Sequence, residues 1–142
     1  MTVHAPARPS FAARLRDPLL VGAGGFALAA LLHVRDPHES GSWGYCPSYF
    51  LTGVECPGCG GLRAVNLLTR GDVVGAVSSN ALAVGLVGLL TVTWAVWFVR
   101  RARGDADARM LRLGQVTAWV VLGVVVAFWV FRLTPWGAWF QP

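Results

Sequence analysis

The chain of 142 residues has few charged side chains and no lysine at all. Charged residues make up only 13% of the sequence, whereas soluble globular proteins usually have about a quarter. Apolar residues reach 55%, and the mean hydropathy is +0.54. A chain of this length forms one domain. Its few polar residues cannot cover a water-soluble globule, and the composition therefore predicts the lipid bilayer as its main partner.

Several functional classes also lack their usual signals. All 12 basic residues are arginines that flank apolar runs, whereas nucleic-acid-binding domains gather basic residues on one face. The sequence has no internal repeat, no phosphate-binding loop and no Ser-His-Asp grouping, and no paired carboxylates lie within an apolar run. A nucleic-acid partner is therefore not expected, and no common hydrolase or nucleotide-binding motif is recognised.

Three apolar runs are long enough, or nearly so, to cross a membrane, since about 20 apolar residues span the hydrocarbon core. The predicted spans are 19–35, 79–99 and 113–131. Trp94 and Trp97 precede Arg100, as interfacial aromatic residues do beside a positive flank. We expect an all-α membrane protein in which residues 18–142 form the transmembrane domain and residues 1–17 a disordered cytoplasmic tail.

The arginines also predict the orientation in a bacterial plasma membrane. The N-terminal tail contains 3 arginines and the second connection 5, while the polar stretch 35–72, which includes the loop 36–72, has 3 over a longer segment and the C-terminus 1. The positive-inside rule therefore places the N-terminus in the cytoplasm, and the loop 36–72 and the C-terminus outside. Ala27-Leu28-Ala29 has the form of a signal-peptide cleavage site, but the apolar run continues past it, which favours an uncleaved span.

The loop 36–72 contains all three cysteines, and two of them form a C-x-x-C turn, Cys56-Pro57-Gly58-Cys59-Gly60. A glycine directly after the second cysteine allows a positive φ, and zinc knuckles present two thiolates from such a turn. Cys46 is a candidate third ligand, and His38, Glu55 and Asp72 are candidates for a fourth. No second C-x-x-C exists, so the sequence indicates half of a zinc site more clearly than a whole one.

Two other interpretations of the cysteines remain open. A short amphipathic or partly re-entrant helix is predicted over 61–70, and its N-terminus together with Arg63 would acidify a redox-active thiol of the pair. Alternatively, Cys46 forms a disulfide with Cys56 or Cys59 and leaves the third thiol inert. The cysteine count favours a structural role first, then metal binding, then redox chemistry.

Polar residues beyond the cysteines mark helix ends. Gly71 is predicted to end the short helix, Asp72 to cap the segment that follows, and Asn80 to be a helix N-cap. The glycines of the first two spans favour close packing of helices, within the chain or between copies.

The order of these motifs resembles an uncharacterised family of small bacterial membrane proteins, a domain of unknown function with the signature C-P-x-C-G-x-T-R-A followed by G-D and N-P. The similarity extends from Cys46-Pro47 through the C-x-x-C turn to about Leu90, with Leu62 in place of the family's Thr and Ala81 in place of its Pro. The resemblance implies a multi-helix membrane protein with one functional constellation and supplies no activity. In this sequence the residues of the constellation are Cys46, Cys56, Cys59, Arg63, Asp72 and Asn80.

The sequence thus favours a non-enzymatic membrane module that forms a homo-oligomer or assembles with another membrane protein. Its Cys loop acts as a disulfide clamp or as a metal knuckle, with zinc as the expected ion. The alternative is an extracytoplasmic thiol-disulfide oxidoreductase that uses Cys56 and Cys59.

Overall fold

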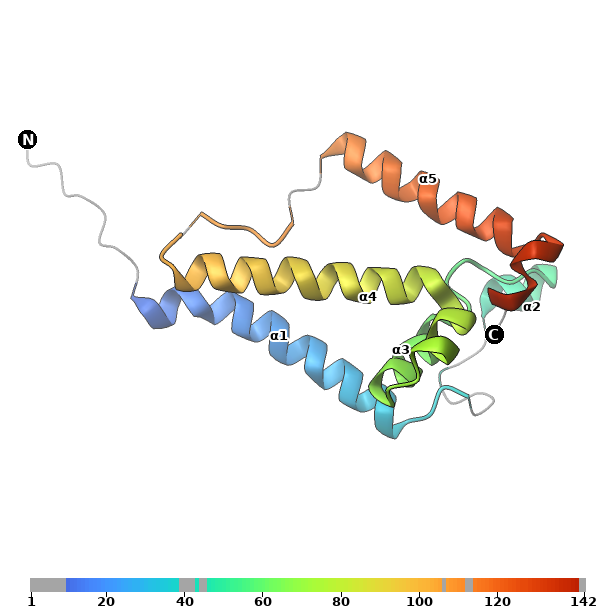
Figure 1. Cartoon of the computed structure of the whole chain (residues 1–142), viewed down its shortest axis with the longest axis horizontal. Helices are drawn as coiled ribbons and strands as arrows, with labels where there is room; N and C mark the ends of the chain where they lie inside the picture. The colour runs from blue at the N-terminus through green and yellow to red at the C-terminus, as the bar shows by residue number, and fades with distance from the viewer. Residues whose placement is uncertain (1–9, 39–42, 44–45, 106, 112–113, 141–142) are drawn as a thin grey trace, which may run out of the picture.

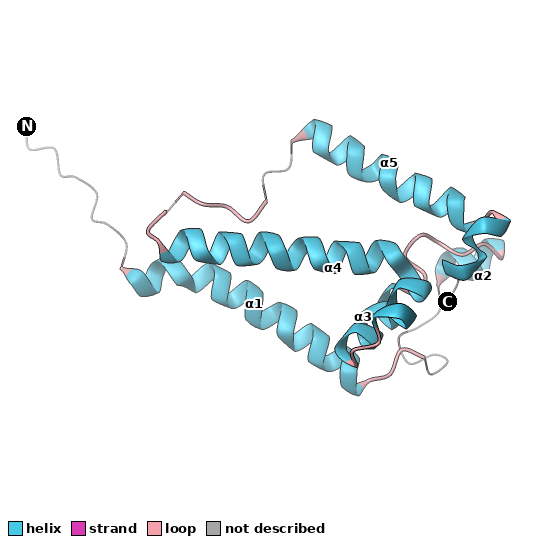
Figure 2. Cartoon of the chain, in the orientation of Figure 1, coloured by secondary structure: helices cyan, strands magenta, loops and turns pink. Residues whose placement is uncertain are grey.

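The computed structural model describes residues 10–38, 43, 46–105, 107–111 and 114–140, and every regular element among them is a helix (Figure 2). Three of the helices are long and apolar enough to cross a membrane, as predicted. Residues 1–9 of the expected tail and Leu113 of the third predicted span lie outside the described residues. In chain order the elements are α1 (Phe11–Val34), α2 (Pro47–Thr52), α3 (Gly61–Thr69), α4 (Val73–Ala102), α5 (Gln115–Arg132) and the 3-10 helix η1 (Pro135–Phe140).

Helix α1 begins at Phe11, well before the predicted start of the first span at residue 19. The Ser10 side chain accepts a hydrogen bond of 3.3 Å from the backbone N–H of Ala13 and so caps the helix. Residues 11–17, which were expected to belong to the tail, are therefore helical. The prediction stopped the span at the charged residues, but a helix can extend beyond the apolar core once its end is capped.

The extension of α1 packs against the end of α4, which runs antiparallel to it (Figure 1). Arg101 donates to Asp17 at 3.3 Å, and the indole of Trp94 donates to the carbonyl oxygen of Pro18 at 2.8 Å. The ring of Trp94 also lies where a Cβ on Gly22 would be, so this glycine allows the close approach of the two helices.

Helix α4 consists of two helical segments that meet at Asn80. Asp72 caps the first segment by accepting the N–H of Gly75 at 2.8 Å. The backbone of Asn80 is not helical, with φ −166° and ψ 95°, and its side-chain oxygen accepts the N–H of Ala83 at 2.9 Å. Both predicted N-caps are confirmed, and the lead-in to the second span is a helical turn joined to it through a kink.

Helix α3 lies between the diverging ends of α1 and α4 (Figure 1). It begins after Gly60 (φ 80°) and ends at Thr69, and Gly71 (φ 81°) follows two residues later, after which the N–H of Asp72 bonds back to the carbonyl of Leu67 at 3.0 Å. The predicted short helix is thus confirmed to within one residue. Ala64 on its inner face is 0% exposed, so α3 fills the space between the two long helices.

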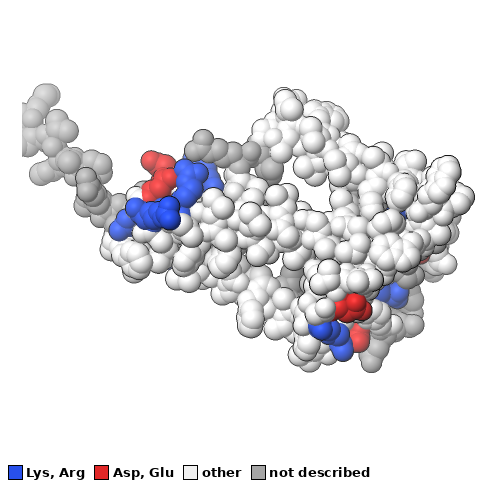
Figure 3. Space-filling model, in the orientation of Figure 1, with Lys and Arg blue, Asp and Glu red and all other residues white. Residues whose placement is uncertain are grey.

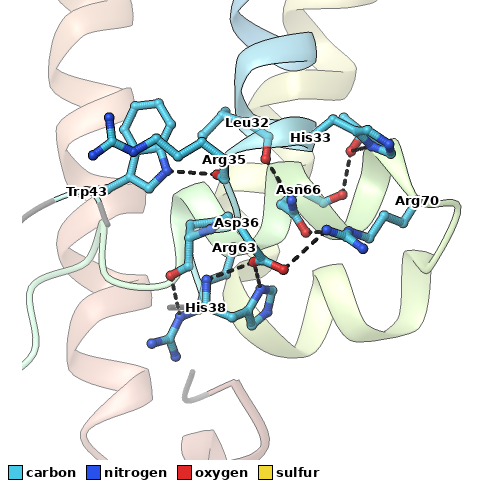
Figure 4. Close-up of polar contacts among 11 residues, drawn as sticks. Leu32, His33, Arg35, Asp36, His38, Trp43, Arg63, Asn66 and Arg70 are labelled. Atoms are coloured by element: carbon cyan, nitrogen blue, oxygen red, sulfur yellow. Dashed lines mark hydrogen bonds and ion pairs between the residues drawn. The ribbon is translucent and has the colours of Figure 1, made fainter. Parts of the chain in front are cut away.

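Polar contacts fasten α3 to the C-terminal end of α1 (Figure 4). The fully buried Asn66 donates to the carbonyl oxygen of Leu32 at 2.7 Å and accepts from Nε of Arg70 at 2.9 Å. Arg70 in turn reaches Asp36 at 3.2 Å. The backbone N–H and then the ring of His38 hold the pKa of Asp36 below its usual range. This network fixes the start of the Cys loop against α3.

Candidate functional site

The Sγ atoms of the three cysteines form a compact triangle. The distances are 3.2 Å from Cys56 to Cys59, 3.2 Å from Cys59 to Cys46 and 3.6 Å from Cys46 to Cys56. All three cysteines are free and half-buried in the structure. Among the described residues, these three are the group of possible ligands close enough together to hold one metal ion.

Local backbone structure brings the sulfurs together. The N–H of Cys59 bonds to the carbonyl of Cys56 at 3.0 Å and closes the turn that the C-x-x-C spacing predicts. The positive φ of Gly60 then directs the chain into α3. Cys46 comes from the other side, directly before α2, where Pro47 occupies the first helical position. Helix α2, which the sequence did not indicate, therefore positions the third thiol.

Asn80 joins the turn to α4. Its side-chain nitrogen donates to the carbonyl oxygens of Pro57 and Cys59, both at 3.0 Å, while its oxygen caps the second segment of α4. The residue is 1% exposed. A single buried amide therefore satisfies two turn carbonyls and one helix N–H, which fixes the cysteine turn relative to the membrane-spanning helix.

Arg132 at the end of α5 supports the same turn, and the sequence did not identify it as a site residue. It is only 3% exposed and donates to the carbonyl oxygen of Cys59 at 3.1 Å and to that of Cys56 at 3.5 Å. Its guanidinium also forms an ion pair with Glu55 at 3.2 Å, and the indole of Trp129 donates to the Glu55 carbonyl at 2.8 Å. In the sequence Arg132 is simply the charge that ends an apolar run, and no spacing links it to residues more than 70 positions earlier.

The thiols of Cys46 and Cys59 differ in acidity. Hydrogen bonds from the backbone N–H of Tyr49 and then from the thiol of Cys59 lower the pKa of Cys46 to about 7. Burial, followed by the hydrogen bonds with the other two thiols, raises the pKa of Cys59 to about 12. Of these two thiols, Cys46 therefore loses its proton more readily.

A cavity of about 470 Å³ adjoins the sulfur cluster. The three cysteines line it together with Arg63, Trp43 and Tyr49, among others. Arg63 extends from α3, and its Nε donates to the carbonyl oxygen of Pro37 at 3.4 Å. Asn80 and Arg132 do not line this cavity, so the cysteines have protein support behind them and open space in front.

The structure brings together only some of the six predicted site residues at the cysteine turn and its cavity. Five of its members contact the cysteine turn or line the cavity, whereas Asp72 caps α4. The other candidates for a fourth ligand also have different partners. His38 bonds to Asp36 at 2.7 Å, and Glu55 pairs with Arg132.

Comparison with known proteins finds a similarity, and it covers the segment that contains the cysteines. Residues 46–94 match the model of a family described as "Protein of unknown function (DUF2752)". None of the curated proteins and none of the solved structures compared with the chain matches it. The matched segment covers about a third of the chain and contains all three cysteines, α3 and most of α4. The chain is therefore similar, over its cysteine turn and the helices that support it, to an uncharacterised domain family.

Proposed function

We propose that the chain is a non-enzymatic accessory module of the bacterial plasma membrane whose Cys46, Cys56 and Cys59 together bind one soft divalent metal ion, zinc first. The observation that carries the proposal is the triangle of sulfurs, whose sides measure 3.2 to 3.6 Å. Zinc and the softer transition metals bind thiolates well. Here two thiolates come from the C-x-x-C turn and the third from Cys46, directly before α2.

The spacing of the sulfurs supports a metal site more than a disulfide. With a Zn–S bond of about 2.3 Å and tetrahedral angles, two sulfurs of a zinc site lie roughly 3.8 Å apart. Two sulfurs of a disulfide lie about 2.0 Å apart, and a disulfide joins only two of three cysteines. The observed distances of 3.2 to 3.6 Å are closer to the first value than to the second for all three pairs. This similarity supports a metal ligand set.

The residues around the triangle support the same role. Asn80 and Arg132 donate to carbonyl oxygens of the turn and not to the sulfurs, so they fix the turn without occupying the metal-binding atoms. Groups that orient metal ligands in this way typically contribute ten- to a hundredfold to metal affinity, by order of magnitude.

The module is proposed to assemble with a second copy or with another membrane protein. Gly24 and Gly25 on α1 and Gly85 and Gly88 on α4 have nothing within 4 Å of the position that a Cβ would take. Small residues on lipid-facing helix surfaces allow another helix to approach closely. The mass of the purified protein in detergent, measured by light scattering, tests this part of the proposal.

Metal content and thiol protection, measured on the same preparation, test the metal site. Protein purified from membranes in a mild detergent without chelator is expected to contain one zinc ion per chain. Its thiols should resist a bulky maleimide until a chelator is added, because the metal occupies the sulfurs. The metal content should fall severalfold in each of the variants Cys46→Ser, Cys56→Ser and Cys59→Ser. Asp72→Asn is the control: it retains a side chain that can cap α4, it lies outside the cysteine cluster, and it should leave the metal content unchanged.

The two alternatives give different results in this experiment. If a reductant rather than a chelator exposes two thiols, a disulfide exists and the metal proposal is wrong. If the thiols label freely in both conditions, and Cys56 and Cys59 form a disulfide by reversible exchange with a disulfide substrate that is reduced to its dithiol, the oxidoreductase alternative replaces it.

A further inference from the structure

The cavity beside the sulfurs is the feature with consequences beyond metal binding. It has a volume of about 470 Å³, enough for a small organic molecule, and all three cysteines line it. Its remaining wall includes the aromatic rings of Trp43 and Tyr49 and two charged residues, Arg63 and Glu55. The Glu55 carboxylate is paired with Arg132 at 3.2 Å, whereas Arg63 forms no ion pair among the described residues, so Arg63 is the group of this wall that can bind an anion.

Three cysteines supply three of the four ligands of a tetrahedral ion. Among the described residues, the group able to hold an ion contains no histidine and no carboxylate. Sites with three protein ligands keep the fourth position for water or for an exogenous ligand. All three cysteines line the cavity, whereas Asn80 and Arg132, which hold carbonyl oxygens of the turn, do not, so the fourth position is expected to face the cavity.

Softness and the charge of Arg63 together select what fills that position. A divalent ion such as zinc that is bound by three thiolates still accepts a soft donor, such as a further thiolate, as its fourth ligand. Arg63 is half-buried at the cavity wall, where its Nε is anchored on the carbonyl oxygen of Pro37. A guanidinium in that position pairs well with a carboxylate.

We propose that the cavity binds a small thiol that also has a carboxylate, with the thiolate as fourth metal ligand and the carboxylate on Arg63. This inference rests on the proposed metal site and adds the class of ligand. The metal–sulfur bond forms as the thiol loses its proton to solvent, and no electron is transferred.

Cobalt-substituted protein tests the inference, since the absorption of Co²⁺ reports its ligands. The full-length protein in detergent is loaded with Co²⁺ and titrated with 3-mercaptopropionate or, as a matched neutral thiol, with 3-mercapto-1-propanol. Wild-type protein is expected to bind 3-mercaptopropionate about tenfold more tightly, as one charge-assisted hydrogen-bonded pair in a partly buried site allows. Desalting followed by metal analysis checks that the thiol binds to the bound metal rather than removing it.

Variants on α3 separate the role of Arg63 from that of its helix. In Arg63→Gln the preference for the carboxylate should fall to nearly one, and Arg63→Lys should restore part of it. Arg70→Gln removes a cation from the same helix, but this residue pairs with Asp36 and does not line the cavity, so the preference should persist.

The outcomes distinguish this inference from the function beneath it. A protein that takes up no Co²⁺ overturns the proposed function and this inference together. A protein that binds Co²⁺ with a spectrum that neither thiol changes keeps its metal site but contradicts the inference, because its own side chain then completes the site. Equal affinity for the two thiols in the wild type contradicts the assignment of Arg63.

Discussion

At the scale of single residues, Asn80 connects the two halves of the site. Its oxygen caps α4 and its nitrogen holds two carbonyl oxygens of the cysteine turn. The two functions use different atoms of one amide, so a substitution can remove one and keep the other.

Replacing Asn80 by Asp is expected to separate these functions. Aspartate still accepts the helix N–H of Ala83 but has no N–H to donate, so the carbonyls of Pro57 and Cys59 lose their partner. We expect a normal helical circular dichroism spectrum and a ten- to a hundredfold loss of zinc affinity, by the usual order of magnitude for a group that orients ligands. Competition with a chromogenic chelator measures the affinity.

Thr91→Val serves as the control for this variant. It removes a polar side chain of α4 that bonds to the carbonyl of Val87 within the same helix, far along the chain from the turn. Its zinc affinity should equal that of the wild type. An Asn80→Asp protein with undiminished affinity would show that the turn holds its shape without the amide.

The sequence predicted some of these residue roles and not others, for a physical reason. The cap at Asn80 is local, because donor and acceptor are three residues apart, and the sequence indicated it. The donation from Asn80 to Pro57 and the contact of Arg132 with Cys59 join residues 23 and 73 positions apart. Only the packing of the helices creates such contacts, and no spacing in one sequence reveals them.

At the scale of elements, α3 determines how the Cys loop meets the first span. Its amphipathic pattern and the glycines beside its two ends are local features, and they predict the helix from the sequence. The pattern did not show that Asn66, on the buried face, bonds to Leu32 of α1, since a polar residue in a short helix is normally assigned to the surface. The early start of α1 was missed for a similar reason, because its support comes from α4.

Replacing Asn66 by Ala tests the attachment of α3 to α1. The substitution leaves the Leu32 carbonyl and Nε of Arg70 without this partner, and the site is fully buried. The free energy of unfolding should fall by about 1–3 kcal/mol, the usual cost of a buried polar group that loses its hydrogen bond. Denaturation in mixed micelles, followed by tryptophan fluorescence, measures the change.

An exposed position on the same helix provides the comparison. Leu62 is 44% exposed, and Leu62→Ala should change the free energy of unfolding by less than about 0.5 kcal/mol. If Asn66→Ala is as mild as this control, α3 is held by its apolar face alone.

At the scale of the whole molecule, the charged side chains of the described residues gather at two ends (Figure 3). On the face shown in Figure 3, arginines and acidic residues gather where α1 begins and α4 ends, and again around α3 and the loop before it, with an uncharged body between. The first end contains the ion pairs Arg101–Asp17 and Arg100–Asp105, and the second contains Arg70–Asp36. This separation fits a molecule that crosses a bilayer with the cysteine cluster at one surface.

The arginine-rich end is predicted to face the cytoplasm and the cysteine cluster the exterior, because arginines in short connections are retained inside. Single cysteines introduced into a Cys46→Ser, Cys56→Ser, Cys59→Ser background can locate both ends. Leu51→Cys, on the exposed side of α2, should react with a membrane-impermeant maleimide in intact cells, and Asp107→Cys only after permeabilisation. The reverse pattern would put the cluster in the reducing cytoplasm, where a disulfide is not expected and the pool of cellular thiols would reach the cavity directly. Orientation therefore decides which thiols meet the proposed metal site, and the expected result restricts them to those outside the cell.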